Sequence, residues 1–219
     1  AVYFTCMNTE QLLTLGKSIM EGLDTWFKAN LLTLNTDKSY FCIFRSSKRF
    51  VQNMPEEIEF NNKFIKRTTS VKYLGVILDE YLDWNEHIAE VCKSLKKYFS
   101  IFYNIKKYLT LEHARVIYYS MIYSKIKYGL SVYGLTSEAN VSKVQILQNK
   151  LLKVLLNKTR RFSTNKLHNE IEILKVKDLI KLEISTFVYN YFKGNLPSPF
   201  NGYFCTFNEV HSINTRENT

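Results

Sequence analysis

The spacing of apolar residues changes near Asp79, and this change limits the fold more than any other feature. Before it, one helical stretch at 8–30 is followed by short runs of apolar residues at 40–45 and 71–79, which are typical of strands. After it, apolar residues recur every three or four positions for most of the remaining chain. The pattern predicts an α+β fold: a small, incomplete β-α-β unit followed by an all-helical region.

The first third of the chain predicts five elements. They are a strand at Val2–Cys6, a helix after Asn8 to about Asn30, a strand at 40–45, a hairpin of 57–60 with 63–66, and a strand at Val71–Asp79. Asn61 and Asn62 suit the hairpin turn because asparagine tolerates a positive φ. Gly75 interrupts the last strand, where it would form a bulge or allow another backbone to approach closely.

Helices follow. Asp83 and Glu86 form a pair resembling a capping box, ahead of a helix from about 84 to 107. Further helices are expected from Thr110 to about Lys125, after Ser137, and from about 176 to 192, where Lys193-Gly194 would end the last one. The polar tail at 208–219 is expected to fray. With only 7 Gly and 3 Pro in 219 residues, intrinsic disorder and collagen-like structure are excluded.

The positive charge is concentrated in one segment. The chain carries a formal charge of +10, from 30 Lys+Arg and 20 Asp+Glu. Residues 93–161 hold 14 basic residues and only two acidic ones, which gives +12, so the rest of the chain sums to −2. Ten aromatic residues lie in the same segment. Interleaved cations and rings favour a nucleic-acid surface slightly over the alternative, a solvated basic face above an ordinary aromatic core.

One predicted helix separates its charges from its apolar residues. At about 100° per residue, polar side chains fall within about 60° of one line: Lys93, Lys96, Lys97, Ser100, Asn104 and Lys107. Ile88, Val91, Cys92, Leu95, Phe99, Phe102 and Ile105 occupy the opposite side. The candidate nucleic-acid-binding residues are Lys93, Lys96, Lys97, Asn104, Lys107, Arg115, Lys150, Lys153, Arg160 and Arg161.

Other chemistry is absent from the sequence. No glycine-rich phosphate loop occurs, no two aspartates are adjacent, and the four histidines lack metal-ligand spacing. The four cysteines are scattered and are interpreted as reduced, mostly buried thiols of an intracellular protein, nuclear or cytoplasmic. No apolar run is long enough to cross a bilayer, so no membrane partner is expected. No metal site or cofactor is predicted in this chain.

Three blocks in order resemble one family. Residues 26–39, WFKANLLTLNTDKS, are similar to the W-x-x-x-N-K-L-x-L-N-x-x-K-T block of non-LTR (LINE, jockey-like) retrotransposon reverse transcriptases. Tyr73-Leu74-Gly75-Val76 and the following Leu82-x-Trp84-x-x-His87-Ile88 resemble that family's Y-L-G-V and L-x-W-x-x-H-I block. Leu147-Gln148-Asn149-Lys150 and Leu167-His168 resemble its L-Q-N-K/R and L-H. The resemblance covers roughly residues 1–200.

The resemblance implies a division of the chain. Residues 1–80 would be the C-terminal part of the polymerase palm, with Tyr73, Leu74 and Gly75 as the primer grip. Residues 81–160 would be the helical thumb, which holds template–primer duplex of RNA and DNA. Residues 161–200 would form a helical connection, and 201–219 a flexible tail.

The same resemblance implies that the catalytic carboxylates lie elsewhere. The family's aromatic-Ala-Asp-Asp-Thr motif precedes a strand that resembles Ala1–Cys6, and Asp24, Asp37, Asp79 and Asp83 match no part of it. Two Mg²⁺ ions held by carboxylates would be needed for polymerisation, so Mg²⁺ is expected only with a complete polymerase. The expected partners are then the missing N-terminal palm and fingers of the same polyprotein. Lys38 matches a lysine that could neutralise the leaving pyrophosphate; the alternative is a solvated turn lysine.

These observations predict a fragment of a retrotransposon RNA-directed DNA polymerase that grips template–primer and is inactive alone. Two alternatives stay open. The chain could be a non-catalytic nucleic-acid-binding module, or a decayed transposon remnant without a selected function.

Overall fold

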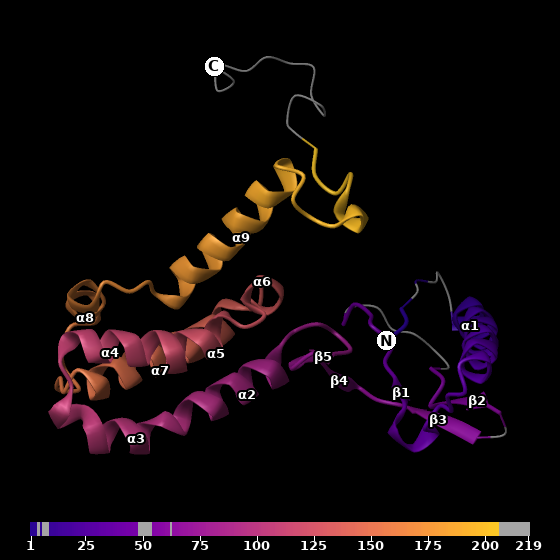
Figure 1. Ribbon diagram of the computed structural model, residues 1–219, viewed down its shortest axis with the longest axis horizontal. Coiled ribbons are helices and arrows are strands. Elements are labelled where there is room, and N and C mark those ends of the chain that lie inside the picture. Colours follow the sequence, from indigo (N-terminus) through magenta and orange to yellow (C-terminus); the bar gives the residue numbers. More distant parts are fainter. Residues whose placement is uncertain (4, 6–8, 48–53, 62, 206–219) are drawn as a thin grey trace, which may run out of the picture. The chain divides into compact units, whose positions relative to one another are not determined.

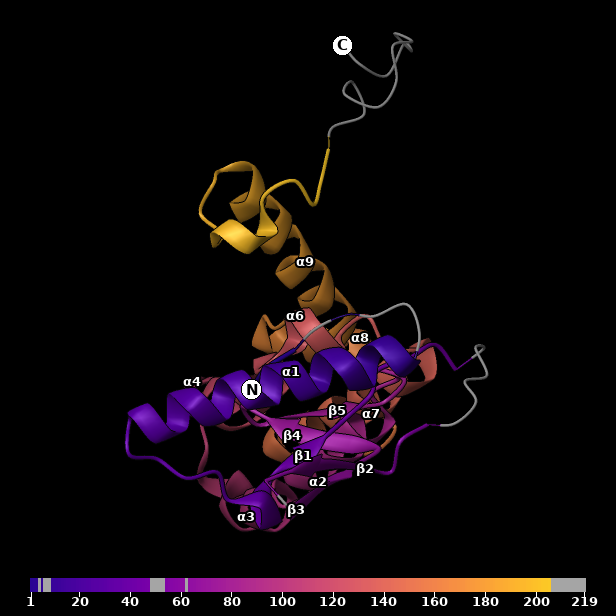
Figure 2. The ribbon, with the colours of Figure 1, turned by 90° about the vertical axis from the view of Figure 1, so that its right-hand side faces the viewer.

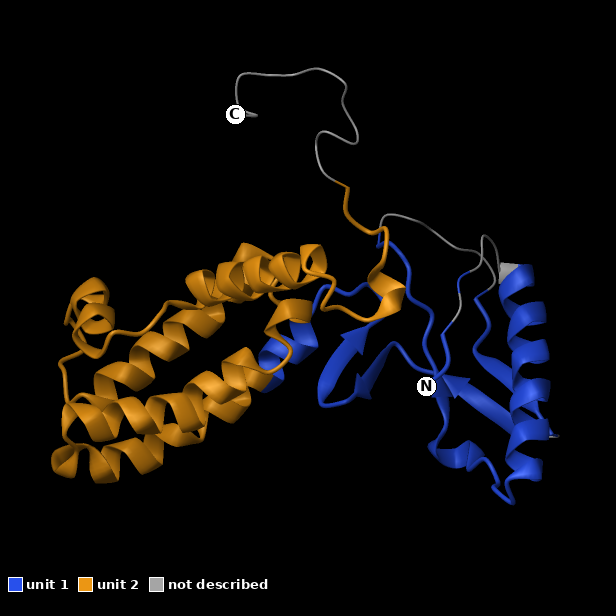
Figure 3. Ribbon diagram, turned by 45° about the horizontal axis from the view of Figure 1, so that its top comes forward, with its two compact units in different colours: residues 1–90 blue, residues 91–219 orange. Residues whose placement is uncertain are grey.

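The computed structural model describes residues 1–3, 5, 9–47, 54–61 and 63–205. These residues form two compact units, 1–90 and 91–219, drawn in different colours in Figure 3. All the strands among the described residues lie in the first unit, and helices make up most of the second. The predicted α+β class is therefore confirmed.

The first unit is built on a three-stranded sheet and one helix. Helix α1 (Thr9–Ala29) packs against β2, and Figure 2 shows it lying across the strands. The strand order is β1-β3-β2, with β1 (Tyr40–Phe41) parallel to β3 (Lys63–Arg67) and β2 (Glu57–Phe60) antiparallel to it. The predicted hairpin is thus confirmed, and Asn61 has a φ of 50° in its turn.

Two predictions for this unit are wrong. Of the expected strand at 40–45, only two residues enter the sheet. Of the expected strand at Val2–Cys6, residues 1–3 and 5 have no strand structure, so the described residues hold no strand ahead of α1. Phe4, Cys6 and the expected helix cap Asn8 lie outside the described residues.

The expected single strand at Val71–Asp79 is a hairpin, and this is the third correction. Strands β4 (Ser70–Tyr73) and β5 (Val76–Asp79) pair antiparallel, with Val71 opposite Leu78. The chain reverses at Leu74 and Gly75, whose φ angles are 45° and 84°. Two successive positive φ angles are the mark of a type I′ turn, for which glycine is well suited at the second position. Gly75 is therefore a turn residue and not a strand bulge.

The predicted helix at 84–107 is present as two helices in nearly one line. Helix α2 (Asn85–Lys96) is followed at Lys97 by α3 (Tyr98–Ile105) and by a 3₁₀ turn, η2 (Lys106–Tyr108), as Figure 1 shows. The boundary between the two units falls within α2. At its start, Asp83 Oδ1 accepts the backbone N–H of Asn85 at 2.9 Å, which satisfies one of the free donors of the first turn.

The rest of the second unit surrounds one long helix. The elements are α4 (Leu111–Ile117), a π-helical turn η3 (Tyr118–Tyr123), α5 (Ser124–Lys127), α6 (Leu130–Tyr133), α7 (Glu138–Leu155), α8 (Thr164–Ile171), α9 (Val176–Phe192) and the 3₁₀ turn η4 (Ser198–Phe200). Helix α7 contacts α3, α8 and α9 (Figure 1). Leu151, Leu152 and Leu155 on α7 are almost completely buried, so the core of the unit lies along this helix.

Most helix ends are confirmed. Thr110 and Ser137 cap α4 and α7 by accepting the N–H groups of His113 and Asn140, and Gly194 ends α9 with a φ of 69°. Helices α6 and α8 were not predicted, because four and eight residues are too short to show a helical period. The expected frayed tail lies outside the described residues. No helix among those described is long and apolar enough to span a membrane.

Candidate nucleic-acid interface

The polar line predicted on one helix is solvent-exposed in the structure. Lys93 and Lys96 on α2, Lys97 at the junction, Asn104 on α3 and Lys107 on η2 are all exposed. Among the described residues, no carboxylate forms an ion pair with any of these four lysines. We call this set, Lys93, Lys96, Lys97, Asn104 and Lys107, the cationic stripe.

The opposite side of the same helices is anchored in the core. Leu95 and Phe102 are each 0% exposed, and α3 packs against α7. The Tyr98 ring stacks on the Phe102 ring with centroids 5.8 Å apart. Burial of these apolar side chains holds the helix axis, so the lysines on its other side project together into solvent.

Five other candidate residues lie on other elements than the stripe. Arg115 on α4 forms an ion pair with Glu172 at 3.0 Å, and Lys153 on α7 donates to the Arg160 carbonyl at 2.8 Å. Lys150 is exposed on α7, and Arg160 and Arg161 are exposed after α7. The structure therefore gathers the stripe residues on one face, whereas Arg115 and Lys153 are bound to the protein itself.

The acidic residues of the second unit are largely neutralised elsewhere. Residues 91–205 contain 19 basic and six acidic residues. Four of those six acids are in ion pairs: Glu138 with Lys177, Glu170 with Lys158, Glu172 with Arg115, and Glu183 with Lys127. Because these acids are paired, little negative charge in the second unit offsets the positive potential of the stripe lysines at the solvent-exposed surface.

The predicted primer-grip residues form the tip of the β4–β5 hairpin. Tyr73 is 47% exposed and Leu74 is 72% exposed, while Gly75 has no side chain. A tip of this kind presents apolar surface and bare backbone to solvent. This geometry suits a close approach by another chain or strand.

A carboxylate fixes the loop that follows the hairpin. Asp79 is buried, and its oxygens accept the backbone N–H groups of Tyr81, Asp83 and Trp84 at 2.9–3.1 Å. Nδ1 of the buried His87 accepts the N–H of Ile77 at 3.3 Å. Burial lowers the pKa of His87, partly opposed by the nearby Glu90 carboxylate, and this shift favours the neutral ring. The W-x-x-H part of the family-like block thus has a structural role here.

Two arginines bind the same loop to the sheet. Arg67 on β3 and Arg45 both reach the buried Glu80 carboxylate, at 2.8 and 3.4 Å, and Arg45 also donates to the Tyr81 hydroxyl at 2.6 Å. Sequence analysis missed this cluster. Its members are far apart in the sequence, and no spacing rule connects them.

Lys38 and the aspartates do not form a catalytic cluster. Lys38 is exposed at the end of the 3₁₀ turn η1 (Thr36–Lys38). Asp24 pairs with Lys28 at 2.6 Å and accepts from Asn61 at 2.8 Å; the Lys28 hydrogen bond lowers its pKa. Within the described part of the chain, no group of three or more His, Cys, Asp or Glu side chains could hold a metal. Cys42 and Cys92 are half-buried, but Cys205 is exposed, unlike the expectation of mostly buried thiols.

The family-like Leu147-Gln148-Asn149 block is a buried polar network. Gln148 is 0% exposed and donates through Nε2 to the Tyr118 hydroxyl at 2.9 Å and to the Leu174 carbonyl at 3.0 Å. Asn149 Oδ1 lies 2.8 Å from His168 Nε2 on α8. Gln145 links the network to α9 by accepting the Val176 N–H at 2.7 Å. These side chains join α7 to η3, α8 and α9.

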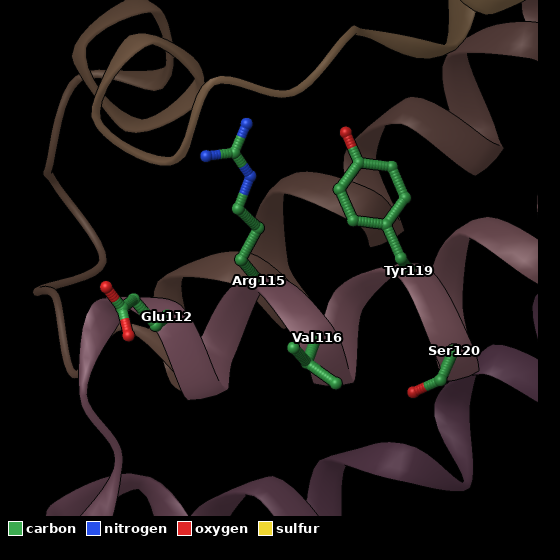
Figure 4. Close-up of a pocket in the computed structure, with 5 residues that line it drawn as sticks. All are labelled: Glu112, Arg115, Val116, Tyr119 and Ser120. Atoms are coloured by element: carbon green, nitrogen blue, oxygen red, sulfur yellow. The ribbon is translucent and has the colours of Figure 1, made fainter.

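An open pocket on α4 and η3 carries no evident chemistry. Its volume is about 630 Å³, and it is lined by Glu112, Arg115, Val116, Tyr119 and Ser120 from one face of α4 and η3 (Figure 4). Figure 4 shows Arg115 and Tyr119 extending to the same side of the helix, with Val116 directed elsewhere. The surface is shallow and mostly apolar.

Comparison with known proteins gives four significant relatives. No protein-family model matches the chain, and no solved structure matches it significantly. The chain is 23% identical to the probable RNA-directed DNA polymerase from transposon X-element of Drosophila melanogaster, over 74% of this chain and 18% of the relative. It is 22% identical to that from transposon BS, over 78% and 19%, and 24% identical to that from mobile element jockey of Drosophila funebris, over 57% and 14%.

The relatives are all of one kind. All four relatives are RNA-directed DNA polymerases of mobile elements. The chain is thus similar to the RNA-directed DNA polymerases of mobile elements that include jockey, in agreement with the resemblance of its sequence blocks. It spans about a fifth or less of the length of these relatives.

Proposed function

We propose that this chain grips a template–primer duplex of RNA and DNA as the thumb-containing part of a retrotransposon RNA-directed DNA polymerase. The cationic stripe is the observation that carries the proposal. Its lysines have no carboxylate partner among the described residues, whereas most acids of the same unit are paired. Lysines without partners neutralise phosphates and release counterions, and they read no sequence.

The length of the stripe suits a duplex backbone. Lys93 and Lys107 are fourteen residues apart, which corresponds to roughly 21 Å along a helix at about 1.5 Å per residue. One strand of a duplex advances about 3.4 Å per phosphate along the axis, so the stripe spans about six phosphates. Four lysines over that length can contact several phosphates without reaching a base edge.

The hairpin tip would act separately, as a primer grip. Tyr73 and Leu74 offer exposed apolar surface, and Gly75 permits a close backbone approach. Lys38 would act only within a complete palm, beside the pyrophosphate leaving group. We expect the catalytic Mg²⁺ ions to be held by carboxylates outside this chain, and therefore no primer extension by the 219-residue polypeptide alone. Mg²⁺-dependent extension of a primer by the purified chain would contradict this part of the proposal.

Duplex binding is tested by salt titration with a charge-matched control. The stripe variant Lys93→Ala/Lys97→Ala/Lys107→Ala is compared with Lys127→Ala/Lys158→Ala/Lys177→Ala, which removes the same charge from lysines that are in ion pairs. Each lost phosphate contact lowers the slope of log affinity against log salt by about 0.7–0.9. We expect the stripe variant to lose about two to three units of slope on every duplex sequence, and the control to lose little.

Two results would reject the duplex grip. A slope near zero for the unmodified chain would show that phosphates are not bound. Equal losses in the stripe variant and the control would show that only net charge matters, and the stripe would then not be the interface.

A further inference from the structure

The C-terminal part of α3 and the following turn η2 expose two aromatic rings, and two lysines lie between them in the sequence. Tyr103 is 56% exposed, and Tyr108 is 82% exposed, the highest value for an aromatic residue in the described part of the second unit. Lys106 Nζ lies 5.0 Å from the centre of the Tyr103 ring. Rings contribute most when they are buried, so two exposed rings five residues apart in the chain mark a segment that can be covered by a partner.

A polar cavity opens at Lys106 and Lys107, which lie between these two tyrosines in the sequence. Its volume is about 280 Å³, and its lining includes Lys106, Lys107, Thr110 and Asn157. Glu170 also lines it, but its carboxylate is 2.7 Å from Lys158 Nζ. Among the described residues, neither Lys106 nor Lys107 is in an ion pair. The cavity can therefore accept an anion the size of one phosphate group.

Rings and cavity lie at the end of the cationic stripe. Tyr103 follows Lys96 by seven residues, two helical turns, so the two side chains share a face. Lys107 belongs both to the stripe and to the lining of the cavity. A strand whose phosphates follow the stripe would reach the rings and the cavity next.

We propose that this end of α3 binds unpaired nucleotides that extend from the duplex: Tyr103 and Tyr108 stack on the bases, and the Lys106–Lys107 cavity receives a phosphate. The inference rests on the proposed duplex grip and adds a single-stranded site to it. Bases inside a duplex have both faces covered by their neighbours, and only unpaired bases can stack on a protein ring. Such stacking accepts every base, because each one has a π-face.

The test compares three ligands by fluorescence anisotropy with the full chain. They are a blunt RNA–DNA duplex and the same duplex with a short single-stranded extension on either the 5′ or the 3′ end of one strand. We expect one extended duplex to bind about tenfold more tightly than the blunt one, the gain from roughly one stacked base. Tyr103→Ala/Tyr108→Ala should abolish that gain and leave binding of the blunt duplex unchanged within about twofold, since the stripe lysines remain.

Matched variants separate stacking from other effects. Tyr103→Phe/Tyr108→Phe keeps both rings and should keep the gain. Tyr189→Ala on α9 is the control: Tyr189 is 61% exposed, with Lys193 Nζ 5.8 Å from its ring centre, so it removes a similar ring from another helix. Lys106→Gln should reduce the gain by removing a phosphate contact.

Several outcomes would overturn the inference. They are equal affinity of the unmodified chain for blunt and extended duplexes, equal weakening of both by Tyr103→Ala/Tyr108→Ala, or the same effect from Tyr189→Ala. Failure of the duplex grip is distinguishable, because it shows as a flat salt dependence with the blunt duplex, whatever the tyrosine variants do.

Discussion

Replacing Gln148 by leucine tests whether the buried polar network holds the second unit together. The substitution keeps the approximate volume of the side chain and removes its hydrogen bonds to the Tyr118 hydroxyl and the Leu174 carbonyl, 2.9 and 3.0 Å long. It also removes the oxygen that accepts from Gln145 Nε2, but that amide still donates to Asn149 Oδ1 at 2.9 Å. Tyr118 is 1% exposed and Gln148 0%, so water cannot replace the lost partner. Burial raises the pKa of Tyr118, which keeps its hydroxyl protonated and able to donate or accept.

The expected cost in free energy comes from the Tyr118 hydroxyl oxygen and the Leu174 carbonyl oxygen, which both lose Gln148 as their hydrogen-bond donor. Each buried group that loses its hydrogen bond costs about 1–3 kcal/mol, and the added apolar surface returns about 1 kcal/mol. We therefore expect Gln148→Leu to lower the free energy of unfolding by about 3 kcal/mol. Tyr118→Phe should cost only about 1 kcal/mol, because Gln148 keeps its bond to Leu174.

The double variant supplies the decisive comparison. With Gln148→Leu and Tyr118→Phe together, no tyrosine hydroxyl is stranded, so the cost should fall below the sum of the single costs by about 1 kcal/mol. Urea unfolding followed by far-UV circular dichroism measures all three values, with the slopes compared to check that the unfolded states match. Additivity within about 0.3 kcal/mol, or a cost of Gln148→Leu below about 1 kcal/mol, would refute the reasoning.

Three further predictions concern the first unit. Asp79→Ala should cost about 3 kcal/mol in urea unfolding, because the backbone N–H groups of Tyr81, Asp83 and Trp84 lose their acceptor. Asp83→Ala, which removes the acceptor of the Asn85 N–H at the start of α2, should cost about 1 kcal/mol, and equal costs would contradict this. Leu74→Asn should stabilise the hairpin by about 1 kcal/mol, measured in the same way, since asparagine tolerates a φ of 45° better than leucine; a loss of stability would contradict it. Burial lowers the pKa of His87 below 6.5 in the folded state. The unfolded state therefore takes up more protons as pH falls, so stability is full above about pH 7 and declines below about pH 6.5. An NMR titration that places the pKa of His87 above 6.5 would contradict this.

The sequence predicted those helices whose apolar residues repeat over many turns or whose first turn has a recognisable capping residue. Helices α1, α7 and α9 repeat their apolar residues over many turns, and Ser137 gives α7 a recognisable start. The β4–β5 hairpin could not be found in this way. Its turn contains leucine where asparagine or aspartate is usual, and apolar residues continue from Tyr73 and Leu74 into Val76–Leu78, so no change of pattern marks the reversal at Leu74 and Gly75.

Contacts between distant residues explain why the family-like blocks were understood only in part. The sequence shows that Trp84 and His87 stand three apart at the start of a helix, but not that the Trp84 N–H reaches Asp79 or that His87 accepts from Ile77. The same holds for Gln148. On a helix surface it would be an ordinary polar residue, and only the positions of η3 and the α8–α9 loop make it a buried link.

The cationic stripe is distinguished from the other basic residues by ion pairs that its lysines do not make among the described residues. Net charge and helical spacing treat Lys93, Arg115 and Lys153 alike. The fold separates them: Arg115 is paired with Glu172, Lys153 is bonded to the Arg160 carbonyl, and Lys93 has no ion-pair partner among the described residues. A phosphate must displace an existing interaction at the first two, while at Lys93 it displaces only water and counterions. The affinity for nucleic acid should therefore follow the unpaired lysines and not the total charge, which is why the charge-matched variants are the discriminating experiment.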